Sequence, residues 1–251
     1  MDHRAKIKTP IALTIAGSDP SSGAGLQADL ETFAACHVHG LSIVTAVTAQ
    51  TPKKFNTLYM LPKKIISAQL SLLFSEYSIP AVKTGLLYKK NVIDLLIRRF
   101  KKQKEIKLIV DPIMKATVGK TLLQPRALES LKKLISTAYI VTPNLYEASV
   151  LSGFLVRNLE EMRKALLQIY KLGPQYILIK GGHLREEPID LFYDGKKIYE
   201  FEKKRIISER FHGLGCRLSA ALTAFIAQDF PILEAVQKSE NYIDQTIPSL
   251  V

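Results

Sequence analysis

Cysteine is scarce in this chain of 251 residues, which contains only Cys36 and Cys216. Two cysteines are too few for a disulfide framework, and their spacing does not match that of a metal site. Long apolar runs are also lacking, so we expect no segment that crosses a bilayer. The apolar stretch 11–16 is interrupted at once by residues 17–19 (Gly-Ser-Asp), which is typical of a strand rather than a signal peptide. These features predict a cytoplasmic protein.

The chain also lacks internal repeats, low-complexity linkers and shifts in composition that would mark a second domain. Its 47% hydrophobic and 23% charged residues can form one substantial core. We therefore predict a single domain over residues 1–251. The net charge is +12, but the basic residues are scattered in short pairs without interleaved aromatics, which favours a solvated surface over nucleic-acid binding. A positive field still favours anionic ligands such as nucleotides.

What the chain does contain is a repeated alternation of short β-branched runs and helical patterns. Strands are predicted at residues 11–16, 42–49, 81–83, 107–110, 138–142 and 176–180. Helices are predicted at residues 26–36, 63–76, 91–102, 125–135, 159–171, 218–227 and 232–242. An Asp-Gly pair within residues 191–199 indicates a hairpin. The alternation predicts an α/β fold with a mainly parallel central sheet and helices on both faces.

Polar and glycine residues gather after the predicted strands, where ligands bind in parallel sheets. They occur at residues 17–25, 48–50, 83–85, 111–112, 142–144 and 180–183. Two familiar nucleotide fingerprints are not met. The glycines of residues 17–25 do not fit G-x-G-x-x-G, and Gly119-Lys120-Thr121 has Met114 where a phosphate loop requires glycine. The chain therefore has neither a dinucleotide fingerprint nor a phosphate loop.

Several of these polar residues have both a structural and a functional interpretation. Gln50 offers a donor and an acceptor, which suits the edge of a heterocycle, although a glutamine at a strand end is commonplace. Asn144 and Glu147 have the spacing of a helix cap, which explains them fully unless a second acid such as Asp111 converges on the same point. Lys180 precedes two glycines, a pattern that suits either a triphosphate or an ordinary turn.

Cys216 presents the sharpest alternative, because it follows Gly213-Leu214-Gly215 at the start of an apolar pattern. Glycines before a helix leave backbone N–H groups free for an anion, and the helix dipole adds positive potential. That potential lowers the pKa of a thiol in the first turn, so a thiolate could accept a proton from an alcohol. Cysteine is also among the most commonly buried residues. The segment by itself leaves both interpretations open.

Taken together, the segments resemble the hydroxymethylpyrimidine/phosphomethylpyrimidine kinases of thiamin biosynthesis, members of the ribokinase-like superfamily. The resemblance covers nearly the whole chain, in the family's order, through LTIAGSDPSSGAGLQADLETF (13–33), TAVTAQ (45–50), VKTGLL (82–87), VDPIM (110–114), TPNLYEASVL (142–151), IKGGHL (179–184) and HGLGCRLSAALTA (212–224). It implies a ribokinase-like three-layer sandwich. It further implies an ATP- and Mg²⁺-dependent kinase that phosphorylates a hydroxymethyl group on an aminopyrimidine, and often its monophosphate. A homodimer is the corresponding expectation.

The resemblance also assigns roles to individual residues. The pyrimidine site is expected to contain Gln50, Gly17, Asp29, Leu86 and Ile113. Lys180, Asn144 and Asp111 are assigned to ATP, and Asp111 and Glu147 to magnesium. Gly213 and Gly215 are assigned to an anion hole, with Cys216 as the catalytic base. Considered by itself, Asp29 could equally be a surface residue of its helix. Such a set suits phosphoryl transfer, which depends mainly on positioning and charge stabilisation.

The chain departs from the family pattern at several positions. Leu214 replaces a threonine, Arg217 follows the cysteine, and residues 210–212 (Arg-Phe-His) replace Asn-Thr-His. Thr117 and Val118 stand where the family commonly has Lys-Ser, and Ser22 replaces a glycine. A lost transition-state donor could cost on the order of 3 kcal/mol, whereas Arg217 could restore positive charge. Three possibilities remain open: a pyrimidine kinase, a kinase of a pyridoxal-type alcohol, and a pyrimidine-binding pseudoenzyme.

Overall fold

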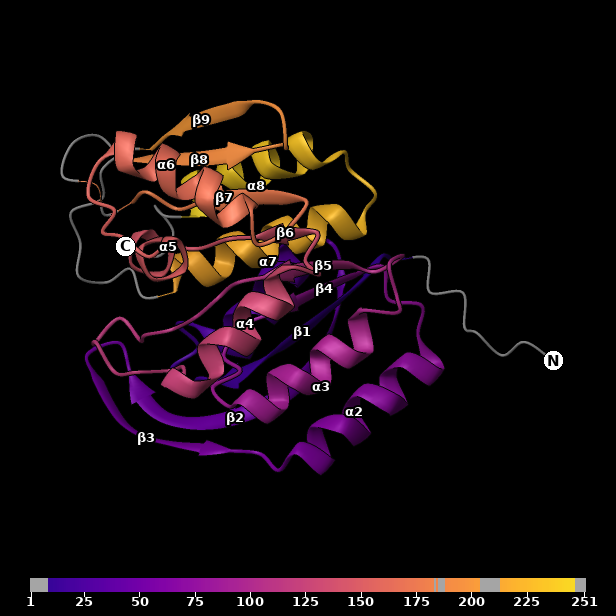
Figure 1. Ribbon diagram of the computed structural model, residues 1–251. Coiled ribbons are helices and arrows are strands. Elements are labelled where there is room, and N and C mark those ends of the chain that lie inside the picture. Colours follow the sequence, from indigo (N-terminus) through magenta and orange to yellow (C-terminus); the bar gives the residue numbers. More distant parts are fainter. Residues whose placement is uncertain (1–8, 183, 185–187, 204–212, 247–251) are drawn as a thin grey trace.

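The computed structural model describes residues 9–182, 184, 188–203 and 213–246 (Figure 1). The strands in this part are β1 (Ile11–Ser18), β2 (His39–Thr51), β3 (Lys54–Met60), β4 (Ala81–Thr84), β5 (Lys107–Val110), β6 (Ile140–Val141), β7 (Tyr176–Ile179), β8 (Ile189–Tyr193) and β9 (Ile198–Glu202). The helices are α1 (Gly25–Ala35), α2 (Lys63–Glu76), α3 (Lys90–Phe100), the 3₁₀ turn η1 (Pro125–Ala127), α4 (Leu128–Ile135), α5 (Leu145–Ser152), α6 (Leu159–Tyr170), α7 (Leu214–Ala227) and α8 (Ile232–Thr246).

The strands of the described residues form one sheet in the order β3-β2-β1-β4-β5-β6-β7-β8-β9. The six strands from β2 to β7 in this order are mutually parallel. β3 at one edge and β8 and β9 at the other pair antiparallel to their neighbours. The parallel strands therefore bring the ends of β1, β4, β5, β6 and β7 to one edge of the sheet, where ligand sites of such folds lie.

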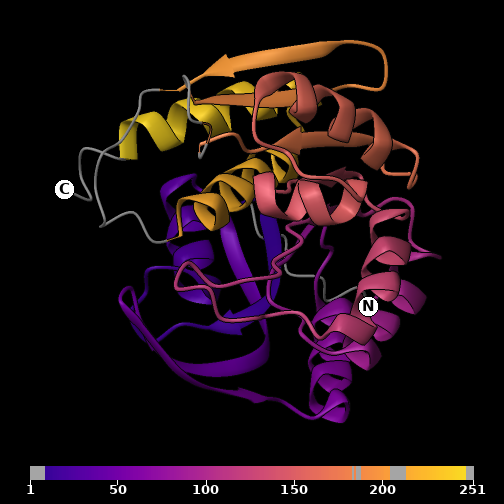
Figure 2. The ribbon, with the colours of Figure 1, turned by 60° about the vertical axis from the view of Figure 1, so that its left-hand side comes forward.

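Helices cover both faces of this sheet. Side chains alternate between the faces along each strand, so on β5 Leu108 and Val110 belong to one hydrophobic core and Ile109 to the other. The first core includes buried residues of α2 to α6, and the second includes buried residues of α1, α7 and α8. Figure 2 shows yellow α7 and α8 across the strands from the magenta helices. The predicted three-layer α/β fold is confirmed.

Most predicted elements are present, with shifted ends. The predicted helix 63–76 and the predicted strand 107–110 have the same bounds as α2 and β5. The hairpin predicted within residues 191–199 is the β8–β9 pair. β3 was not predicted, because its residues are mostly exposed on an edge and show little apolar alternation. The predicted strand 42–49 extends to Thr51, and its last part leaves the parallel sheet to pair with β3.

Helix α7 begins at Leu214, four residues before the predicted start at residue 218. Gly213 is its N-cap, with a left-handed backbone at φ +88°, which glycine adopts without steric cost. A Cβ atom on Gly213 would also collide with the carbonyl oxygen of Gly23. The earlier start places Gly215 and Cys216 in the first turn of the helix, where backbone N–H groups have no partner within the helix.

Candidate active site

A cavity of about 510 Å³ lies at the carboxyl ends of the parallel strands. It is lined by residues that follow β1, β4, β5, β6 and β7, and by the first turn of α7. Of the predicted site residues, the cavity lining includes Gly17, Gln50, Leu86, Asp111, Ile113, Asn144, Glu147, Lys180, Gly213, Gly215 and Cys216. The structure therefore brings together side chains that are far apart in the sequence, in the kind of concave site that small molecules occupy.

One end of the cavity is largely apolar. Leu86 and Leu122 belong to a small buried cluster, against which Ile113 and Phe55 pack, and all four line the cavity. Gln50 lines the same cavity from the ribbon formed by β2 and β3, at the point where their register shifts. The prediction that Gln50 ends a strand is wrong in detail, because β2 continues to Thr51. An amide at an apolar wall provides both a donor and an acceptor for a flat heterocycle.

Asp29 is absent from the described residues that line the cavity. It lies on α1 and is completely buried, and its two carboxylate oxygens accept hydrogen bonds from Lys83 Nζ at 2.7 and 2.8 Å. Thr14 Oγ1 donates to the same carboxylate at 2.6 Å. The geometry gives no support to the predicted contact between Asp29 and substrate, nor to a surface position. Lys83, its partner, does line the cavity.

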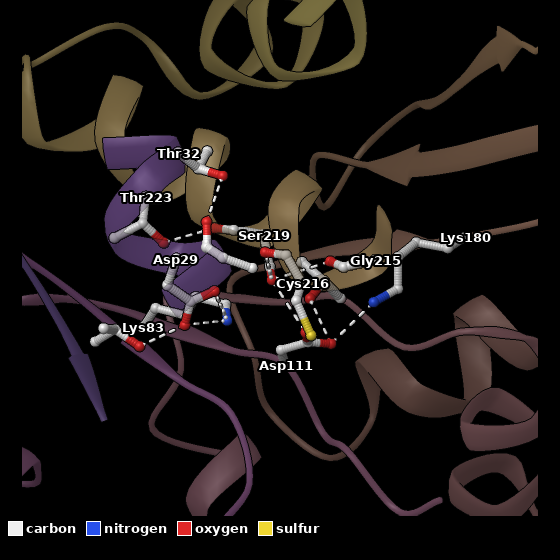
Figure 3. A network of polar contacts seen from close by, with 12 residues as sticks. Asp29, Thr32, Lys83, Asp111, Lys180, Gly215, Cys216, Ser219 and Thr223 are labelled. Carbon is white, nitrogen blue, oxygen red and sulfur yellow. Dashed lines mark hydrogen bonds and ion pairs between the residues drawn. The ribbon is translucent and has the colours of Figure 1, made fainter. Parts of the chain in front are cut away.

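The opposite end of the cavity is charged, and Figure 3 shows its central network. Lys180 Nζ donates to Asp111 Oδ1 at 2.8 Å, and Ser219 Oγ on α7 donates to Asp111 Oδ2 at 3.0 Å. Burial lowers the pKa of Lys180, but the nearby carboxylates of Asp111 and Glu147 outweigh burial, so the pKa is raised and the lysine stays charged. This network fixes a cation beside the first turn of α7, where a phosphate charge can be neutralised.

Asn144 and Glu147 form the predicted cap of α5. The Asn144 side chain accepts from Glu147 N at 2.9 Å, and the Glu147 carboxylate accepts from Asn144 N at 2.9 Å, which completes a capping box. Both residues nevertheless line the cavity. Burial raises the pKa of Glu147 to about 7. The negative charge of Asp111 adds to this rise, and the positive charge of Lys180 partly counteracts it. Capping is thus confirmed, and Asp111 is the second acid at the same point.

The first turn of α7 combines the glycine turn with Cys216. Gly215 lies so close to Lys180 that a Cβ atom would be 3.2 Å from Lys180 Nζ. The predicted lowering of the Cys216 pKa is wrong for the protein without ligands. Burial raises the pKa of its thiol to about 11, and the charges of Lys83 and Lys180 only partly counteract this. Removing water from the thiol therefore outweighs the two nearby cations.

Arg217 does not replace the missing phosphate donor. Its side chain points to α1, where Nη2 donates to Glu31 Oε2 at 2.8 Å and approaches the Ser22 carbonyl at 3.4 Å. Leu214 and Thr117 line the cavity, whereas Val118 is exposed. Residues 210–212 lie outside the described residues. The positive charge expected from Arg217 is thus directed away from the cavity.

Several lining residues had no role in the sequence analysis. Lys115 lines the cavity two positions before Thr117, and its ammonium group lies 4.1 Å from the ring centre of Tyr146. Beyond Lys180 lies a further charged group, in which Lys203 forms ion pairs with Glu240 and, at 3.3 Å, with Asp244. Asp190, in the otherwise apolar β8, accepts from Gly181 N at 2.7 Å. A buried acid within an apolar strand was a signal that sequence reasoning could have used.

Oxygen ligands for a cation are available from Asp111 and Glu147. Over the described residues no group of three or more His, Cys, Asp or Glu side chains is placed to hold a metal ion. Mg²⁺ is commonly bound by one or two carboxylates together with substrate phosphates, so the pair fits this ion. Among the helices of the same part of the chain, none has the length and apolarity needed to cross a membrane.

Comparisons with known proteins agree with this geometry. Residues 19–250 match the family model described as phosphomethylpyrimidine kinase. A hydroxymethylpyrimidine/phosphomethylpyrimidine kinase of Rhizobium meliloti is 40% identical, over 95% of this chain and 91% of the relative. A crystal structure of phosphomethylpyrimidine kinase from Clostridium difficile 630 has a TM-score of 0.85 at 39% identity, covering 95% of this chain and 99% of the other. Pyridoxal kinase from Staphylococcus aureus, in complex with AMP-PCP and pyridoxal, has a TM-score of 0.84 at 32% identity, covering 94% and 86%.

Proposed function

The chain belongs to the phosphomethylpyrimidine kinase family, and we propose on this premise that it transfers the γ-phosphoryl group of ATP to hydroxymethylpyrimidine, to its monophosphate, or to both. The observation that carries the proposal is the shared cavity. Gln50 and an apolar wall lie at one end, the Lys180–Asp111 pair lies at the other, and the glycine turn with Cys216 belongs to the same lining. A substrate alcohol and a triphosphate can meet at this turn.

The apolar end suits the ring of the substrate. Leu86, Ile113 and Leu122 would contact its faces, and Gln50 would bond to the ring nitrogen and amino group. These contacts would orient the hydroxymethyl group toward Cys216. Orientation of this kind contributes much of the rate of phosphoryl transfer, because the protein has little covalent chemistry to perform.

The charged end suits the triphosphate. Backbone N–H groups in the first turn of α7 would donate to the transferring phosphoryl group, and Lys180 would neutralise part of its charge. Asp111 and Glu147 would hold Mg²⁺, which when bound would neutralise charge on the phosphate oxygens. Leu214 does not remove these donors, because they belong to the backbone.

Cys216 would act as the general base. Its thiolate would accept the hydroxyl proton while the substrate oxygen forms a bond to the γ-phosphorus, and the bond from that phosphorus to the bridging oxygen breaks with its electron pair leaving on ADP. With a thiol pKa of about 11, only a small fraction is thiolate at neutral pH. The step therefore begins with loss of the thiol proton, and turnover is expected to rise with pH.

The test is ATP turnover with hydroxymethylpyrimidine and with its phosphate, for the wild type and Cys216→Ala. Loss of a general base is expected to lower kcat by about 10²- to 10⁴-fold. Cys36→Ala is the matched control, since Cys36 is buried outside the cavity lining of the described residues. Full activity of Cys216→Ala would exclude the base role. Pyrimidine binding without turnover in the wild type would establish the pseudoenzyme instead.

A pyridoxal kinase is the second candidate, because solved pyridoxal kinases share the fold at 32–35% identity. An apolar wall with one amide also accommodates a pyridine ring that carries a hydroxymethyl group. Competition between pyridoxal and hydroxymethylpyrimidine for turnover would decide between the substrates. The absence of any pyridoxal binding would eliminate this candidate.

The homodimer and the cytoplasmic location stay predictions. The mass of the protein in solution, measured by light scattering across a range of concentrations, tests the first. Fractionation of the cells that make it tests the second.

A further inference from the structure

A buried ion pair beside the active site has no part in the mechanism proposed above. The carboxylate of Asp29 and the ammonium group of Lys83 have side-chain exposures of 0% and 1%, and their closest atoms are 2.7 Å apart. Thr14 Oγ1 completes the arrangement with a hydrogen bond to Asp29 at 2.6 Å. The three side chains come from β1, α1 and β4, so elements that are distant in the sequence cooperate to hold one ammonium group in place.

A contribution to folding stability does not explain why this ion pair is buried. Taking two charges out of water costs several kcal/mol per ion, and apolar replacements of buried pairs are often neutral or stabilising. The other three residues of β4 are also fully buried but uncharged, since Ala81 and Val82 are apolar and Thr84 is a neutral polar residue. A buried cation next to a cavity is therefore better explained by an electrostatic role.

The position of Lys83 indicates which group it acts on. Lys83 and Cys216 line the same cavity, and Figure 3 shows the Asp29–Lys83 pair near the first turn of α7. Four charges act on the thiol: Lys83 on β4, Lys180 after β7, Asp111 after β5 and Asp29 on α1. Among them, Lys83 is the strongest influence that favours the thiolate against burial. Lys180 has the weaker effect, and its charge is engaged by Asp111.

We propose that Lys83, held in place by Asp29 and Thr14, is a positioning residue that stabilises the Cys216 thiolate. A role of Lys83 in catalysis rests on the proposed function, in which Cys216 is the base. The effect of Lys83 on the pKa of the thiol does not rest on that function, because the acidity of a thiol can be measured without turnover. The cation held by Asp29 and Thr14 explains what favours ionisation of the Cys216 thiol, which is only partly exposed, since burial opposes ionisation and a fixed cation supports it.

The experiment measures alkylation of Cys216 by the uncharged reagent iodoacetamide between pH 7 and 10, followed by mass spectrometry of the intact protein. All proteins carry Cys36→Ala, so that one thiol reacts. Lys83→Met is expected to slow alkylation roughly threefold for each unit by which the thiol pKa rises. This factor arises because a tenfold loss of thiolate is partly offset by greater nucleophilicity. Lys164→Met, at an exposed lysine, is the matched control and should react at the parent rate.

Two further variants separate the electrostatic role from folding and from access to the thiol. Lys83→Met leaves Asp29 buried without a partner, so Asp29→Leu/Lys83→Met removes both charges together and is expected to fold and still react more slowly than the parent. Lys83→Arg keeps the positive charge in a larger side chain. If the charge controls the reactivity of the thiol, this variant should react at the parent rate, and if the size of the side chain controls access of the reagent, it should react more slowly. Parent-like rates in the folded double variant would overturn the proposal.

The outcome is independent of the kinase assay. Slower alkylation in the Lys83 variants combined with an active Cys216→Ala enzyme would support the role of Lys83 and reject the base role of Cys216. If both hold, the Lys83 variants should lower kcat, with a smaller effect at high pH, and leave the KM for the pyrimidine nearly unchanged.

Discussion

The two ends of the cavity are built on different principles. At the apolar end, Leu86, Leu122 and Ile113 belong to a packed cluster, and Gln50 is the predicted polar contact. At the charged end, Lys180, Asp111 and Glu147 influence one another at close range. The apolar end can recognise a ring by shape and one amide, whereas the charged end can stabilise charge that develops during phosphoryl transfer. We expect variants at the first end to change KM and variants at the second to change kcat.

Among the variants that compare the two ends, Lys180→Met is expected to have the largest effect. It removes the cation beside the glycine turn and leaves Asp111 without its ion pair, so kcat should fall by about 10²- to 10³-fold, while the KM for the pyrimidine changes little. Steady-state kinetics with ATP and hydroxymethylpyrimidine checks this, and Lys196→Met, at an exposed lysine, is the control. A rise in the pyrimidine KM with unchanged kcat would break the distinction between the two ends.

Glu147→Gln tests, in the absence of substrate, how much the buried charge of Glu147 destabilises the folded protein. The pKa of Glu147 in the folded protein, about 7, lies above its ordinary value of 4.5, so folding penalises the ionised form. That penalty is absent below about pH 4.5, develops as the pH rises to 7, and is complete above 7. Glutamine does not titrate, so the variant should be more stable above pH 7 by up to about 3 kcal/mol. Its side-chain carbonyl can still accept from Asn144 N.

Urea unfolding at pH 5 and pH 8 measures the advantage of Glu147→Gln. The chain offers a matched control in α6, where Asn158 accepts from Glu161 N at 2.9 Å and Glu161 is partly exposed rather than buried. Glu161→Gln should show no comparable gain between the two pH values. An equal gain in both variants would assign the effect to capping rather than to the buried charge of the active site.

Gln50→Ala tests the apolar end. Removing the amide should raise the KM for the pyrimidine by roughly 10- to 50-fold, since polar groups of the ring lose their partner in a site with little water. The kcat should stay within about threefold of the wild type. The same kinetics with Gln168→Ala, at an exposed position of α6, serves as control. If kcat falls and KM does not, the pyrimidine does not bind where we place it.

The sequence predicted the fold better than it predicted the electrostatics of the site. The apolar pattern located α2, whose buried residues face one core, and β5, whose apolar residues are buried on both faces of the sheet, but it missed the exposed edge strand β3. The segments that resemble the family located Cys216. Its acidity was predicted from the helix dipole, which is a local property, whereas burial and the charge of Lys83 depend on three-dimensional packing. Asp29 was assigned to the pyrimidine site by the family resemblance, and no local pattern could indicate its ion pair, because its partner Lys83 is 54 residues away in the sequence.

Arg217 gives the smallest predicted effect and tests the boundary of the charged end. A positive residue next to Cys216 in the sequence resembles a phosphate ligand, yet its guanidinium group binds Glu31, whose side chain is 53% exposed. Such a pair is worth about 0.2 to 1 kcal/mol, and the buried Arg217 Nε, which has no hydrogen-bond partner among the described residues, offsets part of that.

We therefore expect Arg217→Thr to change the free energy of unfolding by less than about 1 kcal/mol and kcat by less than about threefold. Glu31→Gln should behave alike, because it breaks the same ion pair from the other side. Urea unfolding and steady-state kinetics on both variants check this. A large loss of kcat in Arg217→Thr but not in Glu31→Gln would mean that the guanidinium group reaches the triphosphate during turnover. In that case, the charged end would extend beyond the first turn of α7.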